Sequence, residues 1–241
     1  MLLVALPLKS PFQKKEYVAM TLYSYCLRYD TGAAPNPYWG VCTLVICKPA
    51  IRRNAVIGDW IVGLGSKEST LGDISEYVVY AMKVTNSMKM SEYDEYCQKN
   101  LPNKIPNIDS AKFERRVGDC IYDFRDSIKP RMRPSVHDNG NRKSDLNGVY
   151  ALLSDYFWYF GNNPVQLPEN LKPIIHPSPG HKSKANDSYV FDFIQWIESL
   201  PYSINKIHGE PQLKYEIINS KDFCKTCAKR DKSDNEIDNA Y

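Results

Sequence analysis

Two polar stretches of the sequence bring together side chains that can do chemistry. The first covers residues 28–53 and mixes asparagine, aromatic and basic residues. An asparagine amide can read a base edge, aromatic rings can stack on bases, and basic side chains can meet phosphate. The alternative is an irregular surface loop with solvated charges; we favour the functional interpretation because long polar loops on a rigid sheet often carry sites. The basic residues predicted to contact phosphate here are Lys48, Arg52 and Arg53.

The second stretch covers residues 125–148, where basic residues outnumber acidic ones. A local excess of this kind is the electrostatic footprint of phosphate binding, so Arg131 and Arg133 are further predicted phosphate contacts. His137 lies beside carboxylates and can do acid–base work near neutral pH. Asp30 and Asp145 are the other acid–base candidates. The alternative, that His137 is an exposed bystander in a loop, stays open.

Metal and cofactor signals are weak. Cys224 and Cys227 form one half of a zinc site without a partner pair at the usual spacing. The sequence contains no P-loop, no dinucleotide-binding glycine motif and no zinc-protease motif. We therefore predict no metal site and no cofactor.

The elements that must position these residues follow an α+β pattern. Runs with strand length and strand composition cover residues 21–29, 41–47, 60–64, 77–84, 120–122 and 148–153. Helical patterns cover residues 91–99, 110–116 and 188–200. We predict an α+β fold in which a strongly bent or barrel-like mixed β-sheet carries peripheral helices.

Length and composition favour one domain in the cytoplasm. The 241 residues suffice for a sizeable core, and the net charge of +3 is too small to imply nucleic-acid binding by itself. The seven cysteines are odd in number and scattered, which favours reduced thiols. No stretch reaches the roughly 18 apolar residues that span a membrane. We predict an N-terminal extension at 1–19, a single domain at 20–218 and a charged tail at 219–241.

Several motifs carry a family resemblance. They are LYSYCLRYD at 22–30, APNP at 34–37, CKP at 47–49, IRR at 51–53, GDWIVG at 58–63, YAMKV at 80–84 and FWYFG at 157–161. Over most of residues 20–200 the sequence resembles the nucleotide modification associated domain 2 family. The resemblance implies a role in DNA-modification or phage-related systems.

The strand-rich pattern with Gly-Asp turns is also similar to PUA-like modules, including the EVE and YTH types. Those modules hold a flipped, modified base in an aromatic pocket. By this analogy Asn36, Trp39 and Trp60 are the base-binding candidates. For Trp60 the alternative is packing in the core, because aromatic side chains dominate protein interiors.

Three hypotheses follow, in order of preference. The first is a binding module for a modified base or nucleotide, with nucleic acid, most simply DNA, as its partner. The second is an enzyme that acts on a nucleotide or modified base through Asp30, His137 or Asp145. The third is a protein-interaction domain within a modification or defence complex.

Overall fold

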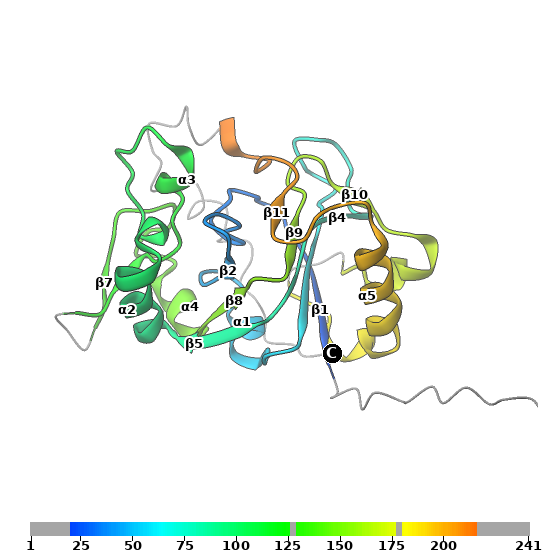
Figure 1. The fold of residues 1–241 in the computed structure, drawn as a ribbon, viewed down its shortest axis with the longest axis horizontal. Helices are drawn as coiled ribbons and strands as arrows, with labels where there is room; N and C mark the ends of the chain where they lie inside the picture. The colour runs from blue at the N-terminus through cyan, green and yellow to red at the C-terminus, as the bar shows by residue number, and fades with distance from the viewer. Residues whose placement is uncertain (1–19, 126–128, 177–179, 216–241) are drawn as a thin grey trace, which may run out of the picture.

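The computed structural model describes residues 20–125, 129–176 and 180–215 (Figure 1). The predicted extension and the whole of the predicted tail, with Cys224 and Cys227, lie outside these residues. The strands are β1 (Leu22–Cys26), β2 (Cys42–Leu44), β3 (Trp60–Leu64), β4 (Tyr77–Lys83), β5 (Asn86–Lys89), β6 (Tyr122–Asp123), β7 (Arg131–Met132), β8 (Tyr150–Ser154), β9 (Phe157–Tyr159), β10 (Val165–Gln166) and β11 (Lys206–Ile207). The α-helices are α1 (Pro49–Asn54), α2 (Met90–Asn100), α3 (Phe113–Arg116), α4 (Arg142–Asn147) and α5 (Val190–Ser199).

The largest sheet has the strand order β1-β3-β4-β9-β11, and β10 also pairs with β4. β1 runs parallel to β3, and β4 runs antiparallel to both β3 and β9. Side chains alternate between the two faces of a strand, so neighbours in the sequence enter different layers. Trp60 and Val62 join one apolar cluster with Phe193 of α5, while Ile61 joins the other cluster.

Each face of this sheet is covered by its own layer. Figure 1 shows α5 on one side of β1 and β4, and α2 and α4 on the opposite side. The amphipathic pattern predicted at residues 188–200 is confirmed as α5, whose Phe193 and Ile197 are fully buried. Burial on both faces explains why strands such as β4 read as nearly continuous apolar runs.

A smaller sheet and a short hairpin build the second layer. β8 lies between β2 and β5 and is antiparallel to both, and β6 pairs with β7. The strand expected at 41–47 ends at Leu44, because the chain then turns through Cys47 and Lys48 into α1. Helices α1 and α4 contact each other beside this small sheet. The turn, α4 and the hairpin together position the site described below.

The α+β class is correct, but the prediction of a barrel-like or strongly bent sheet is wrong. The described strands form separate sheets, and neither large sheet closes on itself. β1 is an edge of the largest sheet, where a bridge between Ser24 and Lys182 covers it instead of another strand of that sheet. Continuous apolar strands require two covered faces, and an open sheet between two layers satisfies this requirement as well as a barrel does. Within the described ranges, no helix combines the length and the apolar character needed to cross a membrane.

Candidate active site

Three side chains from distant parts of the sequence form a hydrogen-bonded chain. Sγ of Cys47 lies 3.4 Å from Nε2 of His137, and Nδ1 of His137 lies 2.7 Å from Oδ2 of Asp145. His137 and Asp145 are 2% and 1% exposed, whereas Cys47 is partly exposed. The arrangement couples a buried acid–base pair to a thiol at the edge of the interior.

The backbone at Cys47 has a conformation that is rare for residues with side chains. Cys47 and Lys48 have φ values of 59° and 41°, in the left-handed region. Such conformations cost of order 1–3 kcal/mol each and collect at active sites. The Cys47 N–H donates to Oδ1 of Asp145 at 3.0 Å, and Nε of Arg52 donates to the Cys47 carbonyl at 2.8 Å. The side chains around the turn therefore hold Cys47 in this conformation.

Arg52 links the three segments that meet at the site. Its side chain is fully buried, and its guanidinium donates to the backbone carbonyls of Cys47, Asp145 and Tyr150. Gly148 leaves room for this group, because a Cβ atom there would lie 2.1 Å from Cζ of Arg52. The predicted phosphate contact at Arg52 is thus occupied, in this structure, with fastening the Cys47 turn to α4.

Hydrogen bonding keeps Asp145 in its ionised form. Its carboxylate accepts from His137 and from the Tyr122 hydroxyl, both at Oδ2, and from the Cys47 N–H at Oδ1. Burial alone would raise the pKa of Asp145, but the charge and hydrogen bond of His137, together with Arg52 and the Cys47 N–H, lower it overall. Because an ionised Asp145 accepts a hydrogen bond, Nδ1 of His137 carries a proton, and in the neutral imidazole Nε2 then presents its lone pair to the thiol.

This arrangement suits nucleophilic catalysis. A histidine oriented by a carboxylate can take the thiol proton and leave a thiolate, which is the reactive form of cysteine. His137 can then return the proton to a leaving group. Within the described ranges, no three His, Cys, Asp or Glu side chains are placed to hold a metal ion, and the three residues here contact one another in series.

Of the predicted acid–base residues, the structure brings His137 and Asp145 together and places Asp30 in a different contact. Asp30 is 1% exposed, accepts the Tyr159 hydroxyl at 2.5 Å and accepts the Gln212 N–H at 3.2 Å. Burial raises the pKa of Asp30 to about 6, partly offset by the hydrogen bond from Tyr159. Its contacts tie the chain after β1 to β9 and to residue 212.

Cys47 is the residue that sequence reasoning missed. It ends an apolar run, so the pattern favoured a strand, and its histidine and aspartate follow 90 and 98 residues later. The available signal was the Cys-Lys-Pro sequence that closes this run, because proline is favoured in the first turn of a helix. A cysteine at a strand-to-helix turn, in a chain with four histidines, is a candidate nucleophile.

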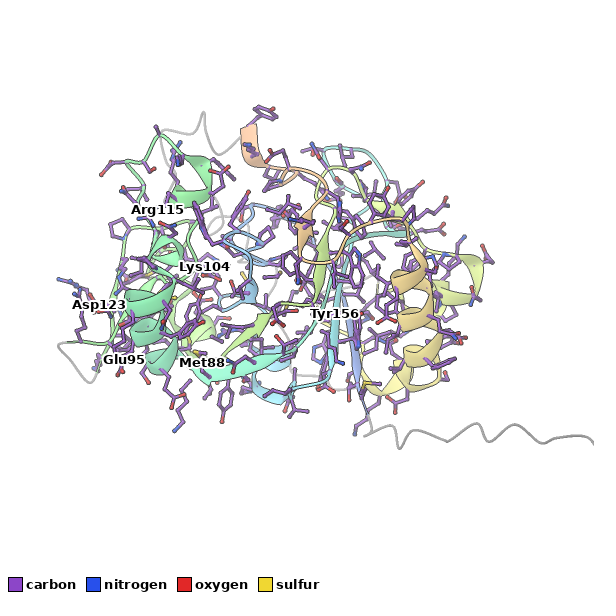
Figure 2. The ribbon with its side chains drawn as sticks, in the orientation of Figure 1. Met88, Glu95, Lys104, Arg115, Asp123 and Tyr156 are labelled. Carbon is purple, nitrogen blue, oxygen red and sulfur yellow. The ribbon has the colours of Figure 1, made fainter. Side chains whose placement is uncertain are left out.

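Two of the three predicted base-binding residues are fully buried. Asn36 accepts from the ammonium group of Lys104 at 2.8 Å and donates to the Val117 carbonyl at 3.0 Å. Figure 2 shows Lys104 inside the molecule, where it is 0% exposed. Trp60 is 1% exposed and stacks on Trp158 with 6.3 Å between ring centroids. Both residues serve the interior in this structure.

Trp39 is the predicted base-binding residue with exposed surface. Its ring is partly buried against the core, and its backbone has a φ of 68°. The indole N–H has no hydrogen-bond partner among the residues that the structure describes. Trp39 therefore keeps a polar group that a neighbouring molecule could use only after local movement, since the atom itself is buried.

Lys48 and Arg53 are the predicted phosphate contacts nearest to Cys47 in the chain. Nζ of Lys48 lies 4.9 Å from the centre of the Tyr25 ring, and Arg53 donates to the Asn147 carbonyl at 3.0 Å. Both side chains are partly exposed. They flank the Cys47 turn on its α1 side and add positive charge there.

Arg131 and Arg133 belong to an ion-pair cluster at the hairpin. Arg133 contacts Asp94 at 2.7 Å and Asp123 at 3.6 Å, and Arg131 contacts Asp123 at 3.2 Å. Figure 2 places Asp123 near the edge of the molecule. The side chain of Arg133 is 12% exposed and that of Arg131 is 74% exposed. Arg131 therefore presents a charge to solvent, while Arg133 mainly holds the hairpin against α2.

The sequence model of one protein family matches residues 19–219 of the chain; its description is nucleotide modification associated domain 2. The chain belongs to this family. No curated protein and no solved structure matches the chain. In this member of the nucleotide modification associated domain 2 family, Cys47, His137 and Asp145 all lie within the matched region.

Proposed function

We propose that the protein is a cysteine-dependent enzyme that acts on a nucleotide or modified base. Cys47 is the nucleophile, His137 is the general base and then the general acid, and Asp145 orients and stabilises the imidazole. The observation that carries the proposal is the unbroken contact chain from Sγ of Cys47 through both ring nitrogens of His137 to the Asp145 carboxylate.

The reaction that best fits these groups is acyl transfer or hydrolysis at a carbonyl carbon. Nε2 of His137 takes the proton of the Cys47 thiol, and Sγ forms a bond to the carbonyl carbon. The carbon–nitrogen or carbon–oxygen bond to the leaving group breaks, and the leaving group takes the proton from His137. Water, deprotonated by His137, then cleaves the thioester and regenerates the thiol.

Charge around the site supports a phosphate-bearing substrate. Residues 47–54 and 139–150 contain four basic side chains besides the buried Arg52, and Asp145 is the single acidic one in these two segments. Lys48 and Arg53 are partly exposed beside the Cys47 turn. Exposed cations beside a nucleophile attract anions and orient them. The family description adds the class of substrate, because it associates the domain with nucleotide modification.

The wider setting of this enzyme is a cytoplasmic DNA-modification or phage-defence system, with nucleic acid or free nucleotide as substrate and other proteins of that system as partners. The binding-module hypothesis remains a prediction with less support. Asn36 and Trp60 make interior contacts, so a base pocket built from them would require the core to open.

The test is to trap the acyl-enzyme. The purified protein is mixed with nucleosides and nucleotides that carry an ester or amide on the base, and peptides are examined by mass spectrometry. The proposal predicts a hydroxylamine-sensitive adduct on Cys47, faster with the 5′-phosphate than with the nucleoside. Cys26, another partly exposed cysteine, serves as the internal control. Its thiol contacts the carbonyl oxygen of Gly65, which cannot take the thiol proton as an imidazole can. Equal adducts on both cysteines, or none on Cys47, would contradict the proposal.

A further inference from the structure

We infer that Tyr122 is a positioning residue that limits the basicity of His137 by sharing an oxygen of Asp145. This inference rests on the proposed function, because it concerns how the same cysteine site is regulated internally. The Tyr122 hydroxyl donates to Oδ2 of Asp145 at 3.0 Å, and that oxygen also accepts from His137 at 2.7 Å.

The hydrogen bond from Tyr122 weakens the attraction between the Asp145 carboxylate and the His137 imidazolium. Each hydrogen bond to Oδ2 neutralises part of the carboxylate charge that stabilises the imidazolium form of His137. Tyr122 and Asp145 are 2% and 1% exposed, so water does not weaken these interactions. Without the hydroxyl, Asp145 would hold the imidazolium more strongly. His137 would then form the ion pair with Cys47 more readily and return its proton to a leaving group less readily.

The backbone of Tyr122 is held firmly enough for this role. Tyr122 pairs with Met132 across the hairpin, and Arg133 donates to the Tyr122 carbonyl at 2.9 Å. Arg133 is held in turn by Asp94 of α2 at 2.7 Å. Burial, followed by the charge of Asp145, raises the pKa of the Tyr122 phenol, so the hydroxyl keeps its proton and remains a donor.

The other charged and hydrogen-bonding groups around Asp145 and Tyr122 are the same in every variant considered below. Arg52 of α1 and the Cys47 N–H from the turn contact Asp145, and Arg142 of α4 acts on Tyr122 electrostatically. None of these groups is altered when the Tyr122 hydroxyl is removed. A shift caused by that removal therefore reports on the shared oxygen.

The experiment measures the rate of iodoacetamide alkylation of Cys47 against pH in the native protein, in Tyr122→Phe and in Tyr93→Phe. Tyr93 is the matched control, because its buried hydroxyl donates to Asp119 at 2.8 Å, away from the site. The alkylation rate rises with pH as the Cys47 thiolate forms, and we call this rise the acid limb. We expect the pH at the midpoint of the acid limb to fall by roughly half a unit in Tyr122→Phe, which corresponds to a rate about threefold higher at a given pH on that limb. Tyr93→Phe should leave the midpoint unchanged.

A second substitution gives the opposite sign and covers the case in which Tyr122→Phe does not fold. 3-Fluorotyrosine at position 122 keeps the ring and makes the hydroxyl a stronger donor, so the midpoint should rise. An acid limb that is present in the native protein but unmoved in either variant overturns the role of Tyr122. If Cys47 of the native protein has no acid limb and alkylates as Cys26 does, the proposed function itself is overturned.

Discussion

The contacts of Arg52 allow the effect of one substitution to be worked out from the structure. Arg52→Lys keeps the charge but replaces a planar group with several donors by a single ammonium group. The native guanidinium donates to three backbone carbonyls, those of Cys47, Asp145 and Tyr150. A lysine can retain part of this set, and hydrogen bonds to charged groups contribute about 1.5–3 kcal/mol each.

We therefore expect Arg52→Lys to lower the free energy of unfolding by about 2–4 kcal/mol. For a protein of this size the melting temperature should fall by roughly 5–15 °C. Urea denaturation measures the free energy, and alkylation at pH 6 reports on the Cys47 turn, whose carbonyl loses a donor. We expect the acid reactivity of Cys47 to fall together with stability.

Arg53→Lys is the matched control, because Arg53 is the next residue in the chain, its side chain is partly exposed rather than buried, and it donates to the Asn147 carbonyl at 3.0 Å. It should change the free energy of unfolding by less than about 0.5 kcal/mol. If the two variants lose equal stability, or if Arg52→Lys is indistinguishable from the native protein, Arg52 does not fasten the Cys47 turn to α4.

Three further predictions concern other contacts. Gly148→Ala should push the Arg52 guanidinium aside, since the added Cβ would lie 2.1 Å from Cζ of Arg52. We expect the free energy of unfolding, measured by urea denaturation, to fall by about 1–3 kcal/mol, and Cys47 to be alkylated more slowly at pH 6. Unchanged values of both would contradict this prediction. The pKa of Asp30 is raised to about 6 from 3.8, so the stability that its protonated form contributes is lost as pH rises from about 4 to about 6. The difference in the free energy of unfolding between the native protein and Asp30→Asn should change by about 3 kcal/mol across that range. A difference that stays constant with pH would contradict this prediction. Trp60→Ala should cost about 3–5 kcal/mol in a thermal or urea melt, because the ring packs on Trp158 and Phe193, whereas a loss under 1 kcal/mol would argue that the ring is available to a ligand.

The sequence predicts individual helices and strands well where the local pattern of apolar residues decides them. The apolar run from Trp60 to Leu64 predicts β3 by its length and composition, and the apolar face of residues 188–200 predicts α5 by its periodicity. Sheet closure depends on which strands pair at the edges, and no local pattern specifies that β1 ends the sheet. The barrel-like prediction failed for this reason.

In the candidate site, too, residue types could be read from the sequence, whereas the contacts between them depend on the fold. Residue type alone made His137 and Asp145 acid–base candidates, and the structure supplies their contact. Cys47 was hidden, because its partners are distant in sequence and its left-handed backbone is fixed by tertiary contacts. Arg52 was predicted to contact phosphate because it is a basic residue in a polar stretch, whereas in this structure its guanidinium donates to backbone carbonyls. Burial, which decides between these roles, is a property of the folded chain.

A comparison of two cysteines within one sample tests whether His137 activates the Cys47 thiol. The rates of iodoacetamide alkylation of Cys47 and Cys26 are measured at pH 6 by peptide mass spectrometry, in the native protein and in His137→Gln. A thiol paired with an imidazolium ionises at lower pH but is less nucleophilic, which leaves a net gain of about tenfold at pH 6. We expect Cys47 to react about tenfold faster than Cys26 in the native protein and to lose this advantage in His137→Gln. Equal rates in the native protein, or an advantage that survives without His137, would contradict it.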